Sequence, residues 1–277
     1  MENRPRAGHR VYLLVFLLLG AALRLVAPGE IPPGLYHDEA QHGLDAVHLL
    51  ESGDLPLYFA ANNGREPLFI YLVTASVALL GRSPLAVRWP SFFVGVLTLA
   101  ATYDLARVLF DRRMGRWALG VLAVTFWHVH LSRVGFRAVL LPLFTALWMA
   151  QAVRAVKRQQ SRHWIAAGAL YGFSWYSYMA ARFTPIALAA FVGYALLAHR
   201  ERTLRRWRGA VLFCFAALLI LAPLGLYTLR HPDVILARTG QVSVFSETIH
   251  QGDLWGTLAR HTFRTAEMFF ARGDRIW

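Results

Sequence analysis

The amino-acid sequence predicts an all-α integral membrane protein with about seven transmembrane helices and a large first outer loop. Hydrophobic residues make up 56% of the 277 residues and charged residues only 16%, a composition too apolar for an ordinary soluble domain. Short arginine-rich segments separate the apolar runs. The formal charge of +13 therefore fits the cytoplasmic loops of a membrane protein better than a nucleic-acid-binding surface, and we expect no nucleic-acid partner.

Eight apolar runs are candidates for helices. A helix needs roughly 20 apolar residues to cross the hydrocarbon layer, with a range of about 17–25. The first run has no A-x-A-like cleavage site and is predicted to remain as an anchor. The second run is short for a membrane span. The candidate runs are 11–27, 67–80, 89–110, 117–131, 136–154, 164–180, 184–198 and 209–228.

Arginine placement decides whether the short run 67–80 crosses the membrane. Short basic loops stay in the cytoplasm, and with a cytoplasmic N-terminus the segments 111–116, 157–163 and 199–208 fall inside only if 67–80 does not cross. We therefore predict that 67–80 is an interfacial or re-entrant helix. The inside segments then carry 14 Lys and Arg residues, against 6 in the outside loops that precede the tail.

This topology predicts two regions of the chain. Residues 1–228 form a transmembrane module, and residues 229–277 form a polar tail on the outer face. The first outer loop, 28–88, holds seven of the 16 acidic residues. Acids concentrated in an outer loop point to chemistry at the membrane surface. The acids of the loop are Glu30, Asp38, Glu39, Asp45, Glu51, Asp54 and Glu66.

The segment 38–50 is predicted to form an amphipathic helix that lies on the membrane. Asp38, His42 and Asp45 fall on one face of that helix by their i, i+4, i+7 spacing. An alternative is that Asp38 only caps the start of the helix, which does not explain why Glu39 follows. A metal site made of His37, Asp38 and His42 is a weaker alternative, since their spacing matches no known ligand signature.

Four segments in order carry a family resemblance: "HDEAQHGLDA", "GREPLFIYL", "GRSPLAVRWPSFFVGVLTLAATYDLARVLF" and "HLSRVGFRAVLLPLF". The sequence resembles the GT-C glycosyltransferases that use polyprenyl-phosphate-linked sugars. Within that group the sequence resembles the protein O-mannosyltransferases and aminoarabinose transferases of glycosyltransferase family 39. The resemblance covers roughly residues 10–230. It implies a GT-C-like module with juxtamembrane helices in the first outer loop, whose C-terminal part is truncated relative to longer relatives.

The resemblance implies inverting transfer of a sugar from a polyprenyl phosphate. By matching positions, Asp38 is the expected acceptor-side base, and Glu39 its catalytic partner. Arg65 stands where the family often has lysine and is a candidate phosphate ligand. Glu66 replaces the first proline of the family's "K-P-P-L"-like segment, which leaves the local geometry open and makes its carboxylate a second candidate contact to the substrate. Arg88 matches the arginine of "R-x-P-S", with an interfacial anchor beside Trp89 as the equal alternative.

Two further arginines are candidate phosphate ligands at the outer ends of helices. Arg133 lies in "SRVGFR", where relatives often have an acid a few residues later and this chain has Arg137. Headgroup anchoring is at least as good an explanation for Arg133 and Arg137. Arg182 ends an aromatic-rich stretch, which is more often a packing surface or an interface belt.

The resemblance also sets the expected partners and location. We expect a polyprenyl-phosphate-sugar donor, a protein or glycolipid acceptor and membrane lipids, and no certain cofactor, with a divalent metal ion left open. The expected location is a bacterial inner or plasma membrane, with the N-terminus cytoplasmic and the active loop extracytoplasmic. Two alternatives remain: a transporter or flippase for a lipid-linked or anionic substrate, which should carry its charges near the midplane, and a non-catalytic truncated remnant.

Overall fold

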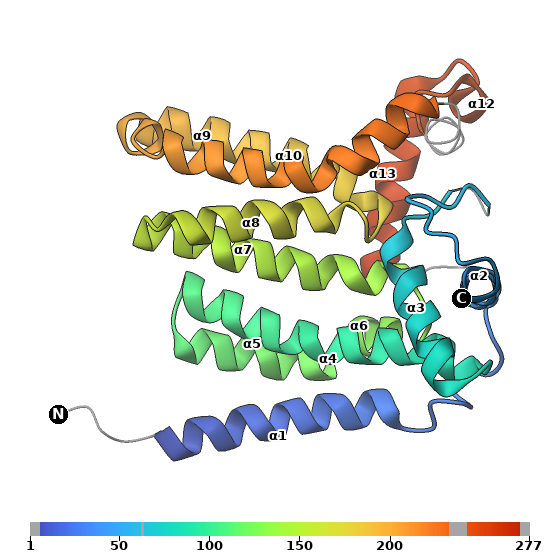
Figure 1. The fold of residues 1–277 in the computed structure, drawn as a ribbon. Helices are drawn as coiled ribbons and strands as arrows, with labels where there is room; N and C mark the ends of the chain where they lie inside the picture. Colours follow the sequence, from blue (N-terminus) through green and yellow to red (C-terminus); the bar gives the residue numbers. More distant parts are fainter. Residues whose placement is uncertain (1–5, 62–63, 233–242, 272–277) are drawn as a thin grey trace. The chain divides into compact units, whose positions relative to one another are not determined.

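The computed structural model describes residues 6–61, 64–232 and 243–271, and its regular elements are helices (Figure 1). The chain forms two compact units, Met1–Gly225 and Leu226–Trp277. The all-α prediction is confirmed for the described residues. The first unit contains α1 (Arg6–Leu25), α2 (His37–Ser52), α3 (Pro67–Leu80), α4 (Pro84–Leu109), α5 (Arg112–Val124), α6 (Phe126–Leu131), η1 (Arg137–Val139), α7 (Leu140–Arg158), α8 (Ser161–Ser174), η2 (Met179–Phe183), α9 (Thr184–Leu204) and most of α10 (Trp207–Arg230).

The predicted tail, 229–277, contains two helices where it is described, α12 (Glu247–His250) and α13 (Leu254–Phe270). Asp253 begins α13 and accepts a hydrogen bond from the backbone N–H of Gly256 at 2.9 Å, which satisfies one of the unpaired N–H groups at the helix start. The placement of the tail on the outer face stays a prediction.

The long helices of the first unit run side by side (Figure 1). Contacts join α1 to α5 and α4, α4 to α7, and α7 to α8. The start of α1 and the three basic segments 111–116, 157–163 and 199–208 lie at one end, here called the basic end, and α2 and α3 lie at the other (Figure 1). This arrangement is the one that the arginine placement predicts.

Four stretches of the described residues are long and apolar enough to cross a membrane: Pro84–Leu109, Arg137–Arg158, Met179–Leu204 and Trp207–Arg230. The count of seven crossings stays a prediction. One predicted span, 117–131, is interrupted. Thr125 has an extended backbone (φ −64°, ψ 117°) and separates α5 from α6. The predicted span 164–180 ends early, because α8 stops at Ser174 and a 3-10 turn follows from Met179.

Residues 67–80 form a helix, α3, with the predicted bounds, and its interfacial or re-entrant placement stays a prediction. It lies across the end of the bundle and not along it (Figure 1). Its 14 residues extend only about 21 Å, less than the hydrocarbon layer requires. Pro67 occupies the first turn, where its missing N–H costs nothing.

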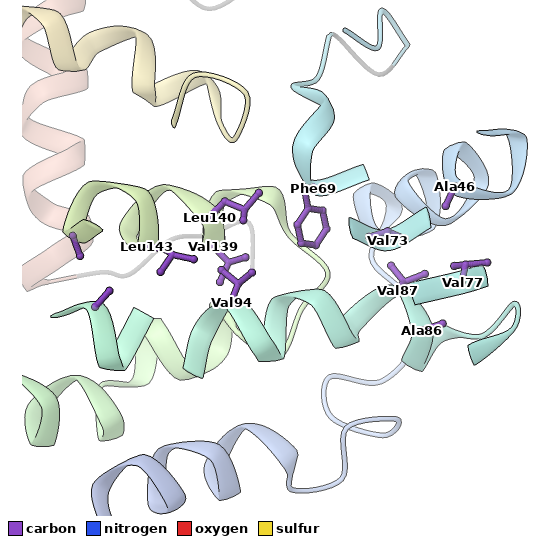
Figure 2. Packing of buried hydrophobic residues seen from close by; sticks show 12 residues of the cluster. Ala46, Phe69, Val73, Val77, Ala86, Val87, Val94, Val139, Leu140 and Leu143 are labelled. Atoms are coloured by element: carbon purple, nitrogen blue, oxygen red, sulfur yellow. The ribbon is translucent and has the colours of Figure 1, made fainter. Parts of the chain in front are cut away.

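A hydrophobic cluster packs the two helices of the first loop, α2 and α3, against the bundle (Figure 2). Ala46 comes from α2, Phe69 from α3 and Val94 from α4, and all three are buried. Val139 of η1 and Leu140 of α7 complete the contact. Helix α2, which carries the paired acids in its first turn, is therefore packed through its middle against α3 and the starts of α4 and α7.

Close packing of α8 against α10 depends on Gly168. An added Cβ would lie 2.1 Å from the carbonyl oxygen of Phe213, a backbone atom that cannot turn away. We predict that Gly168→Ala lowers the free energy of unfolding by about 1–3 kcal/mol, measured by thermal unfolding in detergent. Gly193→Ala is the matched control, since no heavy atom lies within 4 Å of its Cβ position. It should be neutral or stabilise by up to about 1 kcal/mol. Equal unfolding midpoints for the two variants would contradict the close α8–α10 contact.

Candidate active site in the first loop

The paired acids Asp38 and Glu39 lie in the first turn of α2, but their side chains have different surroundings. The helix begins at His37, with Tyr36 as its N-cap. The backbone N–H of Tyr36 donates to Glu39 Oε2 at 3.0 Å, so the carboxylate that reaches back to the helix start belongs to Glu39. The alternative in which Asp38 makes this bond at the helix start is corrected, because the acceptor is Glu39.

Glu39 forms a buried ion pair with Arg88. Arg88 Nε donates to Glu39 Oε1 at 2.9 Å and Nη2 donates to Oε2 at 3.2 Å. Its Nη1 donates to the carbonyls of Pro28 and Pro32, and Nη2 also donates to that of Gly34. These bonds use all five N–H groups of the guanidinium.

Both expectations for Arg88, a phosphate ligand and an interfacial anchor, are therefore wrong. It is only 3% exposed, so it is no headgroup anchor, and its occupied N–H groups leave none for a phosphate. It acts as a clamp that joins the start of α4, the segment after α1 and the first turn of α2. Glu39 in turn is a positioning residue, because its carboxylate is fully buried and engaged on both oxygens.

Gly135 ties α2 to the segment before α7. Its backbone N–H donates to Glu39 Oε1 at 2.7 Å, and its carbonyl lies 3.0 Å from Nδ1 of His42. A carbonyl can only accept, so the proton of the neutral imidazole is on Nδ1. A Cβ at residue 135 would lie 3.3 Å from Glu39 Oε1. Glycine thus permits the close approach of this segment to α2.

His42 is held in its neutral form. Burial lowers its pKa from 6.5 to about 4, and the positive charges of Arg65 and Arg137 act in the same direction. The hydrogen bond to Gly135 and the negative charge of Asp38 oppose them. His42 Nε2 is buried without a hydrogen-bond partner among the described residues, so a second proton there would be a buried charge.

The weaker alternative of a metal site made of His37, Asp38 and His42 finds no support in the geometry of the described residues. His37 is exposed on the loop, with Nε2 3.5 Å from Asp38 Oδ1, whereas the His42 ring turns to Gly135. Across residues 6–61, 64–232 and 243–271, no group of three or more His, Cys, Asp or Glu side chains is arranged to hold a metal ion.

Arg65 bonds to two residues of the first loop, Asp45 and Ala61. It is fully buried, donates from Nη1 to Asp45 Oδ2 and from Nε to the Ala61 carbonyl at 3.2 Å. Its guanidinium also lies over the Phe59 ring at 5.8 Å. Residues 59 and 65 exchange two backbone hydrogen bonds. Full burial and the bond to Asp45 favour a structural role for Arg65. Its Nη2 is buried without a hydrogen-bond partner among the described residues, and the expected phosphate contact stays a prediction.

Glu66 joins two arginines that the chain supplies from distant segments. Its Oε1 accepts from Arg182 Nη2 at 3.0 Å, and its Oε2 lies 3.4 Å from Arg137 Nε. Each guanidinium also lies over a tyrosine ring, Arg137 over Tyr178 at 5.7 Å and Arg182 over Tyr58 at 5.9 Å. One carboxylate is thus shared by two partly exposed cations, which leaves the cluster Arg137–Glu66–Arg182 with a net positive charge.

Arg133 closes the C-terminal end of α1. Its Nη1 donates to the Leu23 carbonyl at 2.8 Å, and its Nη2 donates to the carbonyls of Val26, Ala27 and Ile31. Cations near a helix C-terminus satisfy its free carbonyls and interact favourably with the helix dipole. Arg133 therefore serves as a cap, and the expectation of a phosphate contact loses its support.

Arg24 is a buried arginine that the sequence analysis did not single out. It is 1% exposed and donates to the carbonyls of Gly20 and Ala123 and to Nδ1 of His128. These partners are two carbonyls and an imidazole from α1, α5 and α6. The i, i+4 spacing of Gly20 and Arg24 could have indicated the first bond, but the partners some hundred residues away leave no local signal.

The site after these assignments consists of Asp38 and the cluster Arg137–Glu66–Arg182. The Asp38 side chain is 23% exposed, in contrast with the fully buried Glu39. Its charge acts on His42 one turn along α2. A partly exposed carboxylate and a net positive cluster thus face the same loop end of the bundle.

The crosswise loop helices, the apolar bundle and the acidic first turn define an integral membrane protein with a GT-C-like fold. The model of one protein family, dolichyl-phosphate-mannose-protein mannosyltransferase, matches residues 64–227. That stretch is more than half of the chain, so the chain belongs to this family. The matched residues include Glu66, Arg137 and Arg182, and α2 precedes them.

Two solved structures from Archaeoglobus fulgidus share the fold. The oligosaccharyltransferase in the apo form matches with a TM-score of 0.69 and 15% identity, over 97% of this chain and 38% of that chain. The oligosaccharyltransferase AglB, in complex with an inhibitory peptide and a dolichol-phosphate, matches with a TM-score of 0.64 and 16% identity, over 96% and 38%. This chain spans well under half of their length. A search of curated proteins finds no match.

The Arg88–Glu39 pair should dominate the stability of the loop. Removal of one partner leaves a buried charge without compensation, so we predict that Arg88→Gln lowers the free energy of unfolding by about 3–5 kcal/mol. The exposed pair Arg82–Glu51 is the matched control, and Arg82→Gln should cost less than about 1 kcal/mol. Thermal unfolding in detergent measures both, and similar losses in the two variants would contradict the clamp.

The lowered pKa of His42 predicts a loss of stability in acid. The unfolded chain takes up the imidazole proton near pH 6.5 and the folded chain only near pH 4. Between these values the unfolded state binds more protons, so the free energy of unfolding falls as the pH drops, by up to roughly 3 kcal/mol.

A comparison of His42→Gln with wild type isolates this effect in urea unfolding at pH 7, 5.5 and 4.5. The amide introduced by this substitution can still donate to the Gly135 carbonyl but takes up no proton, so the variant should lose less stability in acid. His48→Gln, at an exposed position of the same helix, should keep the wild-type pH dependence. If His42→Gln also kept it, His42 would not be the group that titrates.

Proposed function

We propose that this chain is a membrane glycosyltransferase that moves a sugar from a polyprenyl-phosphate-linked donor to an acceptor hydroxyl. The transfer takes place at the extracytoplasmic face and inverts the anomeric carbon. Family membership supports the reaction class. The position of Asp38 carries the assignment of the site: it is the member of the acidic pair that the clamp leaves partly exposed.

Asp38 is the proposed acceptor-side base. It takes the proton of the acceptor hydroxyl as the oxygen bonds to the anomeric carbon, and the bond from that carbon to the phosphate oxygen breaks. The phosphate leaves with the bonding electrons, and attack from the opposite face gives inversion. Glu39 supports this role as a positioning residue, since its bonds to Arg88 and Gly135 fix the turn that presents Asp38.

Arg137 and Arg182 are the proposed partners of the departing phosphate. Both are partly exposed guanidinium groups, and the guanidinium fork suits phosphate oxygens. Positive groups near the leaving oxygen stabilise the charge that develops there. Glu66, which replaces a family proline, holds the two arginines in place. Arg88 and Arg133 build the surrounding structure, so the phosphate role passes to Arg182 and to Arg137.

The neighbouring AglB structure supports the choice of substrates to test. It contains a dolichol-phosphate and an inhibitory peptide, which favours a polyprenyl-phosphate donor and a protein acceptor, with a glycolipid acceptor as the second choice. The basic end of the bundle supports a cytoplasmic N-terminus. We place the chain in a bacterial inner or plasma membrane, with α2 and α3 on the outer side.

The proposal predicts that Asp38→Asn abolishes sugar transfer. Loss of a general base costs about 10²–10⁴-fold in rate, and the amide keeps the size of the side chain. The measurement is transfer of radiolabelled sugar from polyprenyl-phosphate donors to acceptors in membranes, at matched expression. Asp54→Asn is the control, because Asp54 is an exposed acid of the same loop and its loss should leave transfer unchanged.

The outcomes separate the competing functions. Undiminished transfer by Asp38→Asn would remove Asp38 from the reaction. Wild-type membranes that take up or flip the labelled lipid without transfer would favour the transporter. Wild-type protein that is folded but neither transfers nor moves any donor would favour a non-catalytic remnant.

A further inference from the structure

A charged hollow is lined by residues at the basic end of the bundle. This end lies at the opposite end of the helices from α2 (Figure 1). The hollow has a volume of about 480 Å³ and opens between the end of α4, the start of α5 and the end of α7. Five cationic side chains line it, Arg107, Arg112, Arg154, Lys157 and Arg158, together with one acid, Asp111. A mechanism confined to the loop end makes no use of this cavity.

Three of the lining cations are held by hydrogen bonds to neighbouring groups. Asp104 accepts two bonds from Arg154 Nη2 at 2.6 Å and one from Arg107 at 2.6 Å, and Arg154 is only 13% exposed. Lys157 Nζ donates to the carbonyls of Val108 and Leu109, which closes the end of α4. These bonds hold three of the cations at fixed positions around the hollow.

The charge at this place is not balanced. Asp104 and Asp111 oppose the five cations, and Asp111 is already the cap of α5, where its Oδ1 accepts from the N–H of Met114 at 2.8 Å. Within the part of the chain that the structure describes, Arg112 and Arg158 have no ion-pair partner. The hollow therefore attracts an anion with more than one charge, and the arginine fork favours phosphate.

Apolar side chains beside the cavity indicate where that phosphate comes from. Phe110, Met114 and Trp117 follow the end of α4 and the start of α5, and all three are large and exposed, by 69%, 45% and 60%. Val156, next to Lys157 on α7, is exposed as well. A basic hollow beside an apolar surface matches a lipid, with its headgroup in the hollow and its chains along the helices.

We infer that this cavity binds the headgroup of an anionic phospholipid, with preference for a headgroup that carries two phosphates. The ligand lies in the leaflet that contains the basic end. Arg112 and Arg158 contact the phosphates, and Arg154, Arg107 and Lys157 supply the field beneath them. The site is independent of the sugar-transfer site at the loop end.

The test is lipid binding by the full chain in detergent. Native mass spectrometry counts bound lipids after addition of cardiolipin, phosphatidylglycerol or phosphatidylcholine, and thermal unfolding with the same lipids or with inorganic phosphate gives apparent affinities. We expect one tightly bound cardiolipin, weaker phosphatidylglycerol and no effect of phosphatidylcholine. The double variant Arg112→Gln/Arg158→Gln should weaken cardiolipin binding at least about tenfold. It removes no ion pair that the structure contains, so the fold should persist.

Arg200→Gln/Arg202→Gln is the matched control, because it removes the same charge from exposed positions at the same end. It should keep the wild-type affinity. An equal loss in both double variants would mean attraction by net charge only and would overturn the site. If inorganic phosphate binds as tightly as cardiolipin, the ligand is not a lipid. If no anion binds saturably, the cavity is not a binding site.

Discussion

The buried pair of Glu39 and Arg88 is the interaction on which the loop end of this protein depends. A guanidinium that donates all five N–H groups joins three segments that the sequence separates: the exit from α1, the first turn of α2 and the start of α4. Charges buried in this way are costly unless every partner is supplied, and here a carboxylate and three carbonyls supply them. The position of α2 at the end of the bundle therefore depends on where α1 ends.

The rest of the site follows from that anchor. With Glu39 turned inward, its neighbour Asp38 on α2 is left partly exposed. Gly135 bonds to both Glu39 and His42, so the segment that carries Arg137 is positioned by the same helix turn. Arg182, 116 residues later in the sequence, donates a hydrogen bond to Glu66. Two residues that looked alike as a pair of adjacent acids thus take separate tasks, one in the structure and one in the proposed chemistry.

The sequence predicted the features that depend on local composition. Apolar runs and arginine-rich loops located the bundle and its two ends, and the placement of the arginines predicted that the short run 67–80 does not cross the membrane. The break at Thr125 was not predictable, because no proline or glycine marks it and its neighbours are as apolar as the helices around it.

The partners of the arginines were beyond prediction for a different reason. Arg65, Arg88, Arg133 and Arg182 share one residue type and lie toward one end of the bundle, and motif position alone suggested a phosphate contact for all four. What distinguishes them is which carbonyls and carboxylates the fold brings within 3–4 Å, and those partners lie up to 116 residues away. The i, i+4 and i, i+3 rules that work inside a helix carry no information over such distances.

The shared carboxylate of Glu66 has a consequence for turnover in the proposed reaction. Two arginines alone would bind a polyprenyl phosphate so strongly that the spent carrier would leave slowly. A negative charge already seated between them weakens that hold, and it also keeps the two cations from repelling each other while no lipid is bound. Glu66 would thus act as an internal competitor of the product, which trades affinity for release.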